Sequence, residues 1–261
     1  RPDQAVEKEW DGSSSSTWSA NNNWTTSGEP STTQVALFDD LGVGRTNANM
    51  TSNDTIAGIR FGAGATVNYN ITGSGSATRT LTLDGVIPYI QQQSASNQTI
   101  SIARLALGAN TVADITAAGN LTIASAIHSS DNLIKDGTGT GKLILSGNNA
   151  NLTGDIFVNN GTLQAAHSSA LGTGTTTVSG GATLELAGGI SPTNALTVAG
   201  AGVGGNGAIR NVSGTNTLSG TITQTGATTI AADTGTTLNL TGNLTGTNTS
   251  TTLAGAGDIA V

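Results

Sequence analysis

Residues 135–166 read KDGTGTGKLILSGNNANLTGDIFVNNGTLQAA, and this stretch decides the fold. Within it, apolar residues alternate with Thr, Ser and Asn over short runs, which is the period of a β-strand with one buried face. Gly and Asn gather between the runs, where they favour turns. No stretch of the chain has a 3.6-residue amphipathic period, so we expect short strands joined by tight turns, with helix nearly absent.

The same strand motif recurs along the chain. It consists of Leu, any residue, then Leu, Ile or Val, followed by a small or polar residue, and it begins at Leu81, Leu121, Leu143, Leu184, Leu196 and Leu238. The intervals 81–121, 143–184 and 196–238 are similar in length, the interval 121–143 is roughly half as long, and the short interval 184–196 departs from this spacing. Most intervals lie near one or two multiples of about twenty, which predicts a repeat of that length.

Two architectures accommodate short strands with regular turns: an antiparallel sandwich and a parallel solenoid. A sandwich core usually needs large aromatic residues, yet aromatic residues make up only 3% of the chain and none of the three Trp lies after residue 24. A coil of about twenty residues can hold three short strands and stack on the next coil at roughly 4.8 Å. We therefore expect a solenoid of about ten coils, with apolar columns inside and Thr and Asn ladders outside.

Residues 135–166 also resemble the autotransporter-associated β-strand repeat, also called the passenger-associated repeat. They share its Gly-Thr-Gly lead, its Leu-x-Leu-Ser-Gly strand, its Asn-rich turn, its Val-bearing strand and its Gly-Thr-Leu. The chain departs from the repeat at residues 150–152, where the family commonly has Thr-Tyr, and its other coils match more loosely. The resemblance implies an all-β, right-handed, single-stranded parallel β-helix exported to the bacterial cell surface, and it brings no catalytic residues.

The first fifty residues differ from the remainder. They hold all three Trp, and residues 9–40 resemble the segment that precedes such repeats in exported bacterial proteins. We expect residues 1–50 to form an N-terminal cap or assembly segment and residues 51–261 to form the β-helix. The aromatic residues would cover the open core and strand edges of the first coil. The alternative is a sugar-binding platform of exposed Trp.

Composition restricts the partners. The chain of 261 residues has a net charge of −7, and its nine Lys and Arg are scattered, which argues against nucleic acid and against an anionic membrane surface. No apolar run reaches the ~20 residues of a membrane span. There is no Cys, and the chain opens RPDQ without an initiator Met or an apolar leader. Such a start is expected of an exported protein after signal removal, and equally of a cloned fragment.

Two glycine-rich stretches suggest nucleotide sites but lack the required context. The Gly-Lys at residues 141–142 would need Gly at position 136 and Ser or Thr at position 143, where the chain has Asp136 and Leu143. The Gly-x-Gly-x-x-Gly formed by Gly200, Gly202 and Gly205 is followed by a strand pattern instead of a helix. We expect both stretches to be turns, and we expect no cofactor and no metal.

Catalytic candidates are sparse. His128 and His167 stand beside serines in turn-like surroundings, and we interpret both as surface residues. Acidic residues are well separated, but Asp114, Asp136 and Asp155 are spaced by about one coil and could form a column on one edge of a solenoid. That column is the best argument for a polysaccharide-active β-helix enzyme.

The C-terminal stretch STTLAGAGDIAV stops on a strand pattern without an aromatic, Pro or charged closure. An open strand edge is a template for another chain, so we expect subunits to join head to tail into a surface filament or fibre. The residues expected at such an interface lie in the cap and the terminal strands: Trp10, Trp18, Trp24, Phe38, Leu253, Ile259 and Val261.

The sequence thus predicts a non-enzymatic extracellular structural protein whose main partner is another copy of itself. A surface polysaccharide or a host surface is a further expected partner. The alternatives are a stalk or passenger fragment of an autotransporter-like adhesin, and a polysaccharide-active enzyme.

Overall fold

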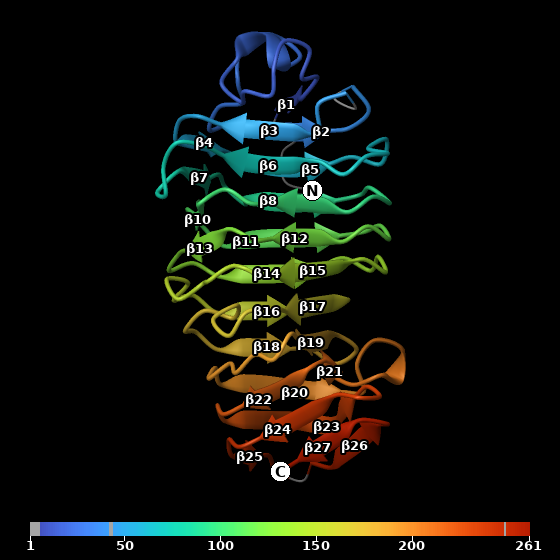
Figure 1. Cartoon of the computed structure of the whole chain (residues 1–261). Helices are drawn as coiled ribbons and strands as arrows, with labels where there is room; N and C mark the ends of the chain where they lie inside the picture. Colours follow the sequence, from blue (N-terminus) through green and yellow to red (C-terminus); the bar gives the residue numbers. More distant parts are fainter. Residues whose placement is uncertain (1–5, 42–43, 248) are drawn as a thin grey trace.

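The computed structural model describes residues 6–41, 44–247 and 249–261. Its strands stack along one axis as a parallel β-solenoid of about ten coils (Figure 1). The only helical turns among these residues are two 3-10 segments, η1 (Asn21–Asn23) and η2 (Val203–Gly205). The predicted all-β, parallel β-helix with an aromatic N-terminal cap is confirmed. None of the helical segments described has the length and apolar character needed to cross a bilayer.

The strands form three columns, in which neighbouring strands from successive coils pair in parallel. The first column consists of β1 (Val6–Glu9), β2 (Gln34–Phe38), β5 (Gly58–Phe61), β8 (Tyr89–Gln92), β11 (Thr111–Ile115), β14 (Leu133–Asp136), β16 (Ile156–Val158), β18 (Thr176–Val178), β20 (Leu196–Gly200), the start of β23 (Ile222–Ala232) and β25 (Leu244–Thr245).

The second column runs beside the first. It consists of β3 (Asn47–Met50), β6 (Asn70–Gly73), β9 (Gln98–Ile100), β12 (Leu121–Ile123), β15 (Lys142–Leu145), β17 (Thr162–Ala165), β19 (Thr183–Ala187), β21 (Ile209–Ser213), the end of β23 and β26 (Thr251–Gly255).

The third column is interrupted. It consists of β4 (Asp54–Ile56), β7 (Thr80–Leu83), β10 (Arg104–Leu107) and β13 (Ala126–His128), and then, after coils in which loops replace the strand, of β22 (Thr215–Leu218), β24 (Thr237–Leu240) and β27 (Asp258–Ala260). The loops still deliver buried Leu152, Leu171 and Ile190 to the core.

The core is a set of apolar columns. In the second column, register places one fully buried Leu or Ile in each of six successive coils: Leu121, Leu143, Leu163, Leu184, Ile209 and Ile230. Burying one such side chain stabilises the fold by about 1.5–3 kcal/mol. The alternating pattern of the sequence therefore places apolar side chains of successive coils in contact with one another.

The repeat motif does not mark one position in the coil. Its copies at Leu121, Leu143 and Leu184 lie in the second column, whereas Leu81 and Leu238 lie in the third and Leu196 lies in the first. The short interval 184–196 thus separates two different columns. Successive partners within the second column, such as Leu143 with Leu163 and Leu184 with Ile209, keep the spacing of one coil.

Asparagine and aspartate side chains extend the pairing around one corner. The side-chain oxygen of Asn110 accepts a hydrogen bond from the Asn132 amide at 3.0 Å, that of Asn132 accepts from the Asp155 amide at 2.9 Å, and that of Asp155 accepts from the Thr175 amide at 2.8 Å. Backbone groups that leave the strand thereby remain satisfied. This ladder is one reason for the high Asn content.

Glycine is required where coils meet at corners. A Cβ on Gly242 would lie 2.0 Å from the carbonyl oxygen of Gly220 in the preceding coil, and one on Gly154 would lie 2.1 Å from that of Asp131. The glycine-rich turns therefore follow from coil stacking.

The boundary expected at residue 50 falls inside the strand ladder. The pairing of β2 with β5 and of β3 with β6 crosses it, and one hydrophobic core extends from Trp10 to Leu240.

Candidate functional site

The charged candidates occupy the side of the solenoid. Asp114 and Asp136 are direct partners in the first column, as the expected acidic column requires. Asp155 does not join them, because it precedes β16 and follows Asn132 in the corner ladder. Asp114 accepts a hydrogen bond from Gln91 Nε2 at 3.4 Å, and Asp136 accepts one from Asn160 Nδ2 at 2.7 Å.

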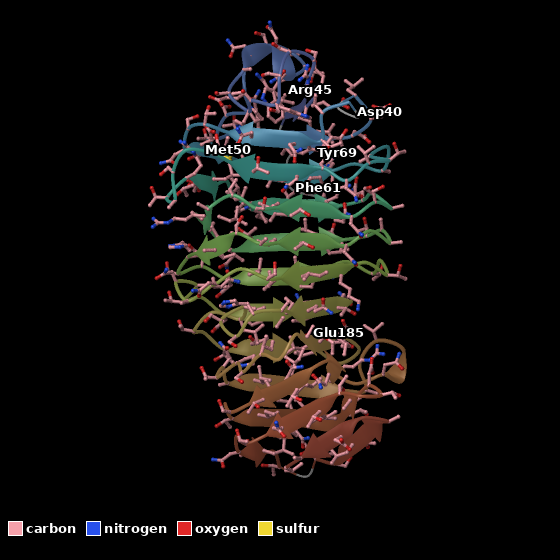
Figure 2. The ribbon with its side chains drawn as sticks, viewed as in Figure 1. Asp40, Arg45, Met50, Phe61, Tyr69 and Glu185 are labelled. Carbon is pink, nitrogen blue, oxygen red and sulfur yellow. The ribbon has the colours of Figure 1, made fainter. Side chains whose placement is uncertain are left out.

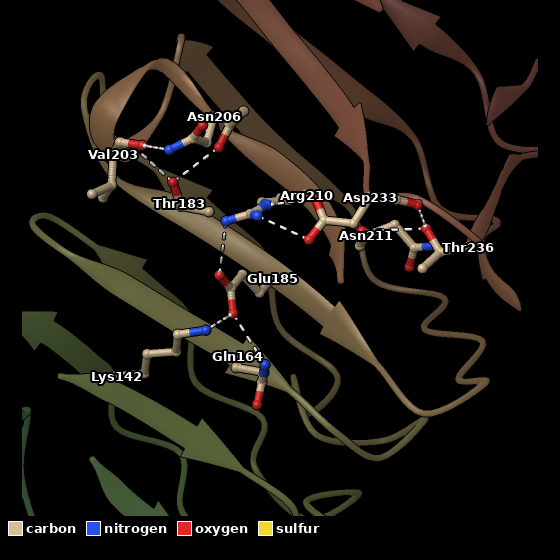
Figure 3. Close-up of polar contacts among 11 residues, drawn as sticks. Lys142, Gln164, Thr183, Glu185, Val203, Asn206, Arg210, Asn211, Asp233 and Thr236 are labelled. Carbon is tan, nitrogen blue, oxygen red and sulfur yellow. Dashed lines mark hydrogen bonds and ion pairs between the residues drawn. The ribbon is translucent and has the colours of Figure 1, made fainter. Parts of the chain in front are cut away.

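A polar ladder on the second column was not anticipated from the sequence (Figure 3). Glu185 is buried, with 3% of its side chain exposed, although it points away from the core. Its carboxylate accepts hydrogen bonds from Lys142 Nζ at 2.6 Å and Gln164 Nε2 at 3.0 Å, and it lies 3.8 Å from Arg210 Nη1. Arg210 forms a two-point pair with Asp233 at 2.8 and 2.9 Å, and this hydrogen bonding raises the pKa of Arg210.

The positive and negative charges within this ladder compensate one another. A buried carboxylate is tolerated when cations and hydrogen bonds compensate its lost hydration, and Glu185 has both. A sequence pattern could have predicted this ladder, because a spacing of about one coil separates Gln164 from Glu185 and Glu185 from Arg210. The arrangement joins successive coils from Lys142 to Asp233.

The glycine-rich stretch at residues 200–207 contacts Thr183 at the start of β19, beside this ladder (Figure 3). Thr183 donates a hydrogen bond to the Gly207 carbonyl at 2.9 Å and accepts one from the Val203 amide at 2.8 Å. A Cβ on Gly202 would meet the Gly207 carbonyl oxygen at 1.9 Å, so the loop closes on itself. It is a turn at a coil corner, and no helix of the kind that binds a dinucleotide follows it within the described residues.

The two histidines belong to different parts of the coil. His128 lies on β13, where burial and the neighbouring Arg104 lower its pKa. His167 Nδ1 accepts a hydrogen bond from the Ser169 amide at 3.0 Å and so closes a turn. Among the residues that the structure describes, no group of three or more His, Cys, Asp or Glu could hold a metal ion.

The N-terminal end is closed by residues 10–33. Trp10, Trp18, Trp24 and Phe38 are each at most 2% exposed. Trp24 lies between the other two Trp rings, with centroids 5.2 Å from Trp10 and 4.8 Å from Trp18, both edge to face. Phe38 stacks on Phe61 at 5.4 Å and continues the aromatic packing into the coils. Figure 2 places Phe61 and Tyr69 beneath this cap, at the end of the solenoid opposite to the terminal coils.

This burial is incompatible with the sugar-binding platform, which needs exposed Trp rings. It also means that the four aromatic side chains plug the core and are not on the surface, so a partner at this end would meet the loops that cover them. Whether either end contacts a second chain stays a prediction.

The cap also pairs with the first strands. The Thr25 amide donates to the Glu9 carbonyl at 2.9 Å, and the Trp18 amide donates to the Asn49 carbonyl at 2.8 Å. Lys8 reaches across the end, and its ammonium donates to the carbonyls of Thr26, Ser27 and Gly28 at 3.3, 3.1 and 2.9 Å. The outer edges of β1 and β3 are thereby protected from pairing with another strand.

At the C-terminal end, no segment among the described residues gives such cover. Within the described part of the chain, β25, β26 and β27 each pair with one strand only, on the side of the preceding coil. Leu253 is 49% exposed and Val261 is 80% exposed, while Ile259 is partly buried against the core. Leu253, Ala254, Gly255, Gly257 and Ile259 line a shallow hollow there.

Comparison of the chain with models of known protein families, with curated proteins and with solved structures finds no match.

Proposed function

We propose that this protein is a non-enzymatic structural component of the cell exterior, a rod whose C-terminal end docks on another copy of the chain. The observation that carries the proposal is the unequal state of the two ends. Among the described residues, β25, β26 and β27 pair on one side only and Leu253 is half exposed, and such an edge can gain strand hydrogen bonds and bury apolar area when it meets another surface.

A head-to-tail contact is the arrangement that we propose. Because cap residues already pair with β1 and β3, the terminal coil would rest on the cap loops and not on a free strand. Such a contact joins two different surfaces and repeats without limit unless it closes into a ring. Repetition would give a filament.

Sedimentation and electron microscopy of the purified chain over a range of concentrations test this proposal. We expect filaments that lengthen with concentration, and we expect Leu253→Lys to shorten them by placing a charge at the contact. The matched control is Val86→Lys, which changes an apolar side chain that is 99% exposed on a lateral loop. Monomers at every concentration would refute self-assembly, and closed dimers would replace the head-to-tail contact with a tail-to-tail one.

The closed cap favours one alternative, a stalk of an adhesin. In that case further coils of the same polypeptide would cover β25, β26 and β27, and no second copy would be needed. Electron microscopy of the full-length gene product distinguishes the two proposals, because a stalk would appear as a single longer rod.

A further inference from the structure

A row of apolar side chains runs along the outside of the first column. It occupies one register position in the successive strands β8, β11, β14 and β16 (Figure 1) and consists of Tyr89, Val112, Ile134 and Phe157. All four side chains are partly exposed, whereas the residues before and after each of them in the chain are buried. We call this row the outer stripe. Beyond Phe157 the same position carries Thr177 and Thr197.

The two ends of the outer stripe are aromatic. Tyr89 pairs with Gly58 of the preceding coil, and a Cβ on Gly58 would lie 3.4 Å from Cγ and Cδ2 of the Tyr89 ring. The ring therefore occupies space that a side chain at Gly58 would need. Ile87, which is 49% exposed, extends the apolar surface beside Tyr89. Phe157 lies three coils away, or roughly 14 Å at the spacing of stacked strands.

One border of the outer stripe is the corner ladder of Asn110, Asn132 and Asp155. Each of these residues stands two positions before a stripe residue and uses one side-chain oxygen to accept a backbone amide of the next coil. Among the described residues, Nδ2 of the two asparagines and Oδ2 of Asp155 have no hydrogen-bond partner. This border therefore offers donors and an acceptor to solvent, once in each coil.

The other border stands two positions after the stripe residues and consists of Gln91, Asp114 and Asp136. Gln91 donates to Asp114 Oδ2 at 3.4 Å, and Asp136 Oδ1 accepts from Asn160 Nδ2 at 2.7 Å. Asp136 Oδ2 has no partner within the described part of the chain. The apolar stripe is thus bordered on both sides by polar groups that repeat with the coils.

We propose that the outer stripe and its two borders bind a neutral, extended, β-linked glycan that lies parallel to the axis of the rod. A sugar ring has apolar C–H faces and a rim of hydroxyl groups, so it matches an apolar row between hydrogen-bonding borders. An extended β-1,4-linked chain advances per sugar by nearly the ~4.8 Å of one coil, so successive sugars meet successive coils. The inference goes beyond the proposed function, because the stripe lies on the side of the rod and not at its ends.

Charge selects a neutral glycan over an acidic one. Asp114, Asp136 and Asp155 border the stripe. The Lys135 ammonium is buried and donates to backbone carbonyls, and Arg60, at the Tyr89 end, is paired with Glu7. A polyanionic chain along the stripe would therefore be repelled by the borders.

The dimensions of the stripe favour a single glycan over a second copy of the protein. Four coils span roughly 20 Å, and the borders are about 13 Å apart, so the surface between them measures less than about 300 Å². A stable protein interface buries about 800 Å² on each partner. Apolar protein surface laid over the borders would also leave their polar groups unpaired.

Calorimetric titration of the full chain with three oligosaccharides tests the proposal. We expect cellohexaose, which is neutral and extended, to bind at least about tenfold more tightly than coiled maltohexaose or acidic hexagalacturonate. Tyr89→Thr combined with Phe157→Thr is expected to weaken cellohexaose binding at least about tenfold, since both ring contacts are lost. The outward position already carries Thr at Thr177, so the fold is expected to tolerate these changes. Thr223→Ala, at the same position in a coil beyond the stripe, is the matched control and is expected to keep the affinity.

Amide chemical shifts of the wild-type chain provide a second measurement that does not depend on any variant. Cellohexaose is expected to shift amides of β11 and β14 and to leave those of β26 and β27 unchanged. Leu253→Lys is expected to keep the affinity for cellohexaose, so the outcome is independent of filament formation.

Four outcomes would overturn the proposal. They are no binding of cellohexaose at millimolar concentration, equal binding of all three oligosaccharides, full affinity in the double variant, and shifts confined to the ends of the rod. Side-by-side pairing of the chain that is lost in the double variant, without any binding of sugar, would assign the stripe to a second copy.

Discussion

The two ends of the solenoid solve the same physical problem to different degrees. Each is an end of the described stack of coils, and each presents strand edges and apolar side chains that lack a neighbouring coil within that stack. At the N-terminal end, Trp10, Trp18 and Trp24 fill the opening, and cap residues pair with the edges of β1 and β3. At the C-terminal end, Leu253 and Val261 are exposed, and each edge strand has one partner among the described residues.

The comparison shows that closing the end of a solenoid requires side chains that fill the opening of the core and residues that pair with the strand edges. The N-terminal cap supplies both, and it concentrates every Trp of the chain within residues 10–24. Unfolding of variants at the two ends measures how much stability the cap supplies.

The largest loss of unfolding free energy is expected from truncating a Trp of the cap. Trp24→Ala removes the ring that lies between Trp10 and Trp18, and truncating a buried Trp costs about 3–5 kcal/mol of unfolding free energy. Leu253→Ala, the matched change at the other end, is expected to cost less than about 1 kcal/mol because that side chain is half exposed. Denaturant unfolding of both variants measures the difference. Equal losses would show that the two ends are closed to the same degree.

A smaller effect is expected from Lys8. Lys8→Met leaves three carbonyls of the cap without a donor, at Thr26, Ser27 and Gly28, and Thr26 and Ser27 have positive φ angles of 62° and 28°. Loss of these part-buried hydrogen bonds from a charged donor costs about 1–3 kcal/mol in total. Hydrogen exchange of the Thr25 and Trp18 amides reports this loosening locally.

Arg104→Met is the control for the Lys8 variant, since it removes a cation from the side of the solenoid and leaves both ends intact. Unchanged exchange at the cap amides in Lys8→Met would mean that the aromatic plug alone holds the cap.

The smallest effect is expected in the pH dependence of stability, which we assign to Glu29. Burial raises the pKa of Glu29 in the cap, and the Asp54 carboxylate raises it further; burial also raises the pKa of Asp54. An acid whose pKa is higher in the folded chain stabilises it below the unfolded pKa of about 4, and this contribution is lost as pH rises through the folded value. Glu29→Gln should therefore stabilise the protein more, relative to wild type, at pH 7 than at pH 4.

Thermal unfolding at the two pH values measures that difference. Asp258→Asn, which removes a carboxylate at the exposed C-terminal end, is the control. A Glu29→Gln effect that does not change with pH would contradict the raised pKa of Glu29.

Much of the architecture was accessible from sequence because strand alternation is a local property. Leu143 and Leu145 are fully buried and Ile144 between them is not, as the motif indicates. The assignment of motif copies to columns was not accessible, because the alternation is the same on every column. Only the lengths of the intervening turns distinguish them, and these vary: the loop at residues 200–208 lengthens the coil that joins Leu184 to its partner Ile209.

The polar interior was harder to foresee. Lys135 occupies a position where alternation expects an apolar side chain, and only the corner carbonyls that accept its hydrogen bonds explain it. Glu185 would have been found by aligning polar residues at one-coil intervals, since such a series consists of Lys142, Gln164, Glu185, Arg210 and Asp233. The open C-terminal edge was indicated by the lack of bulky residues, whereas its occupant depends on surfaces outside the described coils.

The parallel stacking has a mechanical consequence. The hydrogen bonds between coils lie along the axis of the rod, so tension applied to its two ends loads these layers in series. We expect the rod to give way one coil at a time, each event releasing the segment between successive partners such as Leu143 and Leu163. Each release would lengthen the chain by roughly 70 Å. Under a steady pull the molecule would extend in steps of one coil each, and so dissipate force gradually.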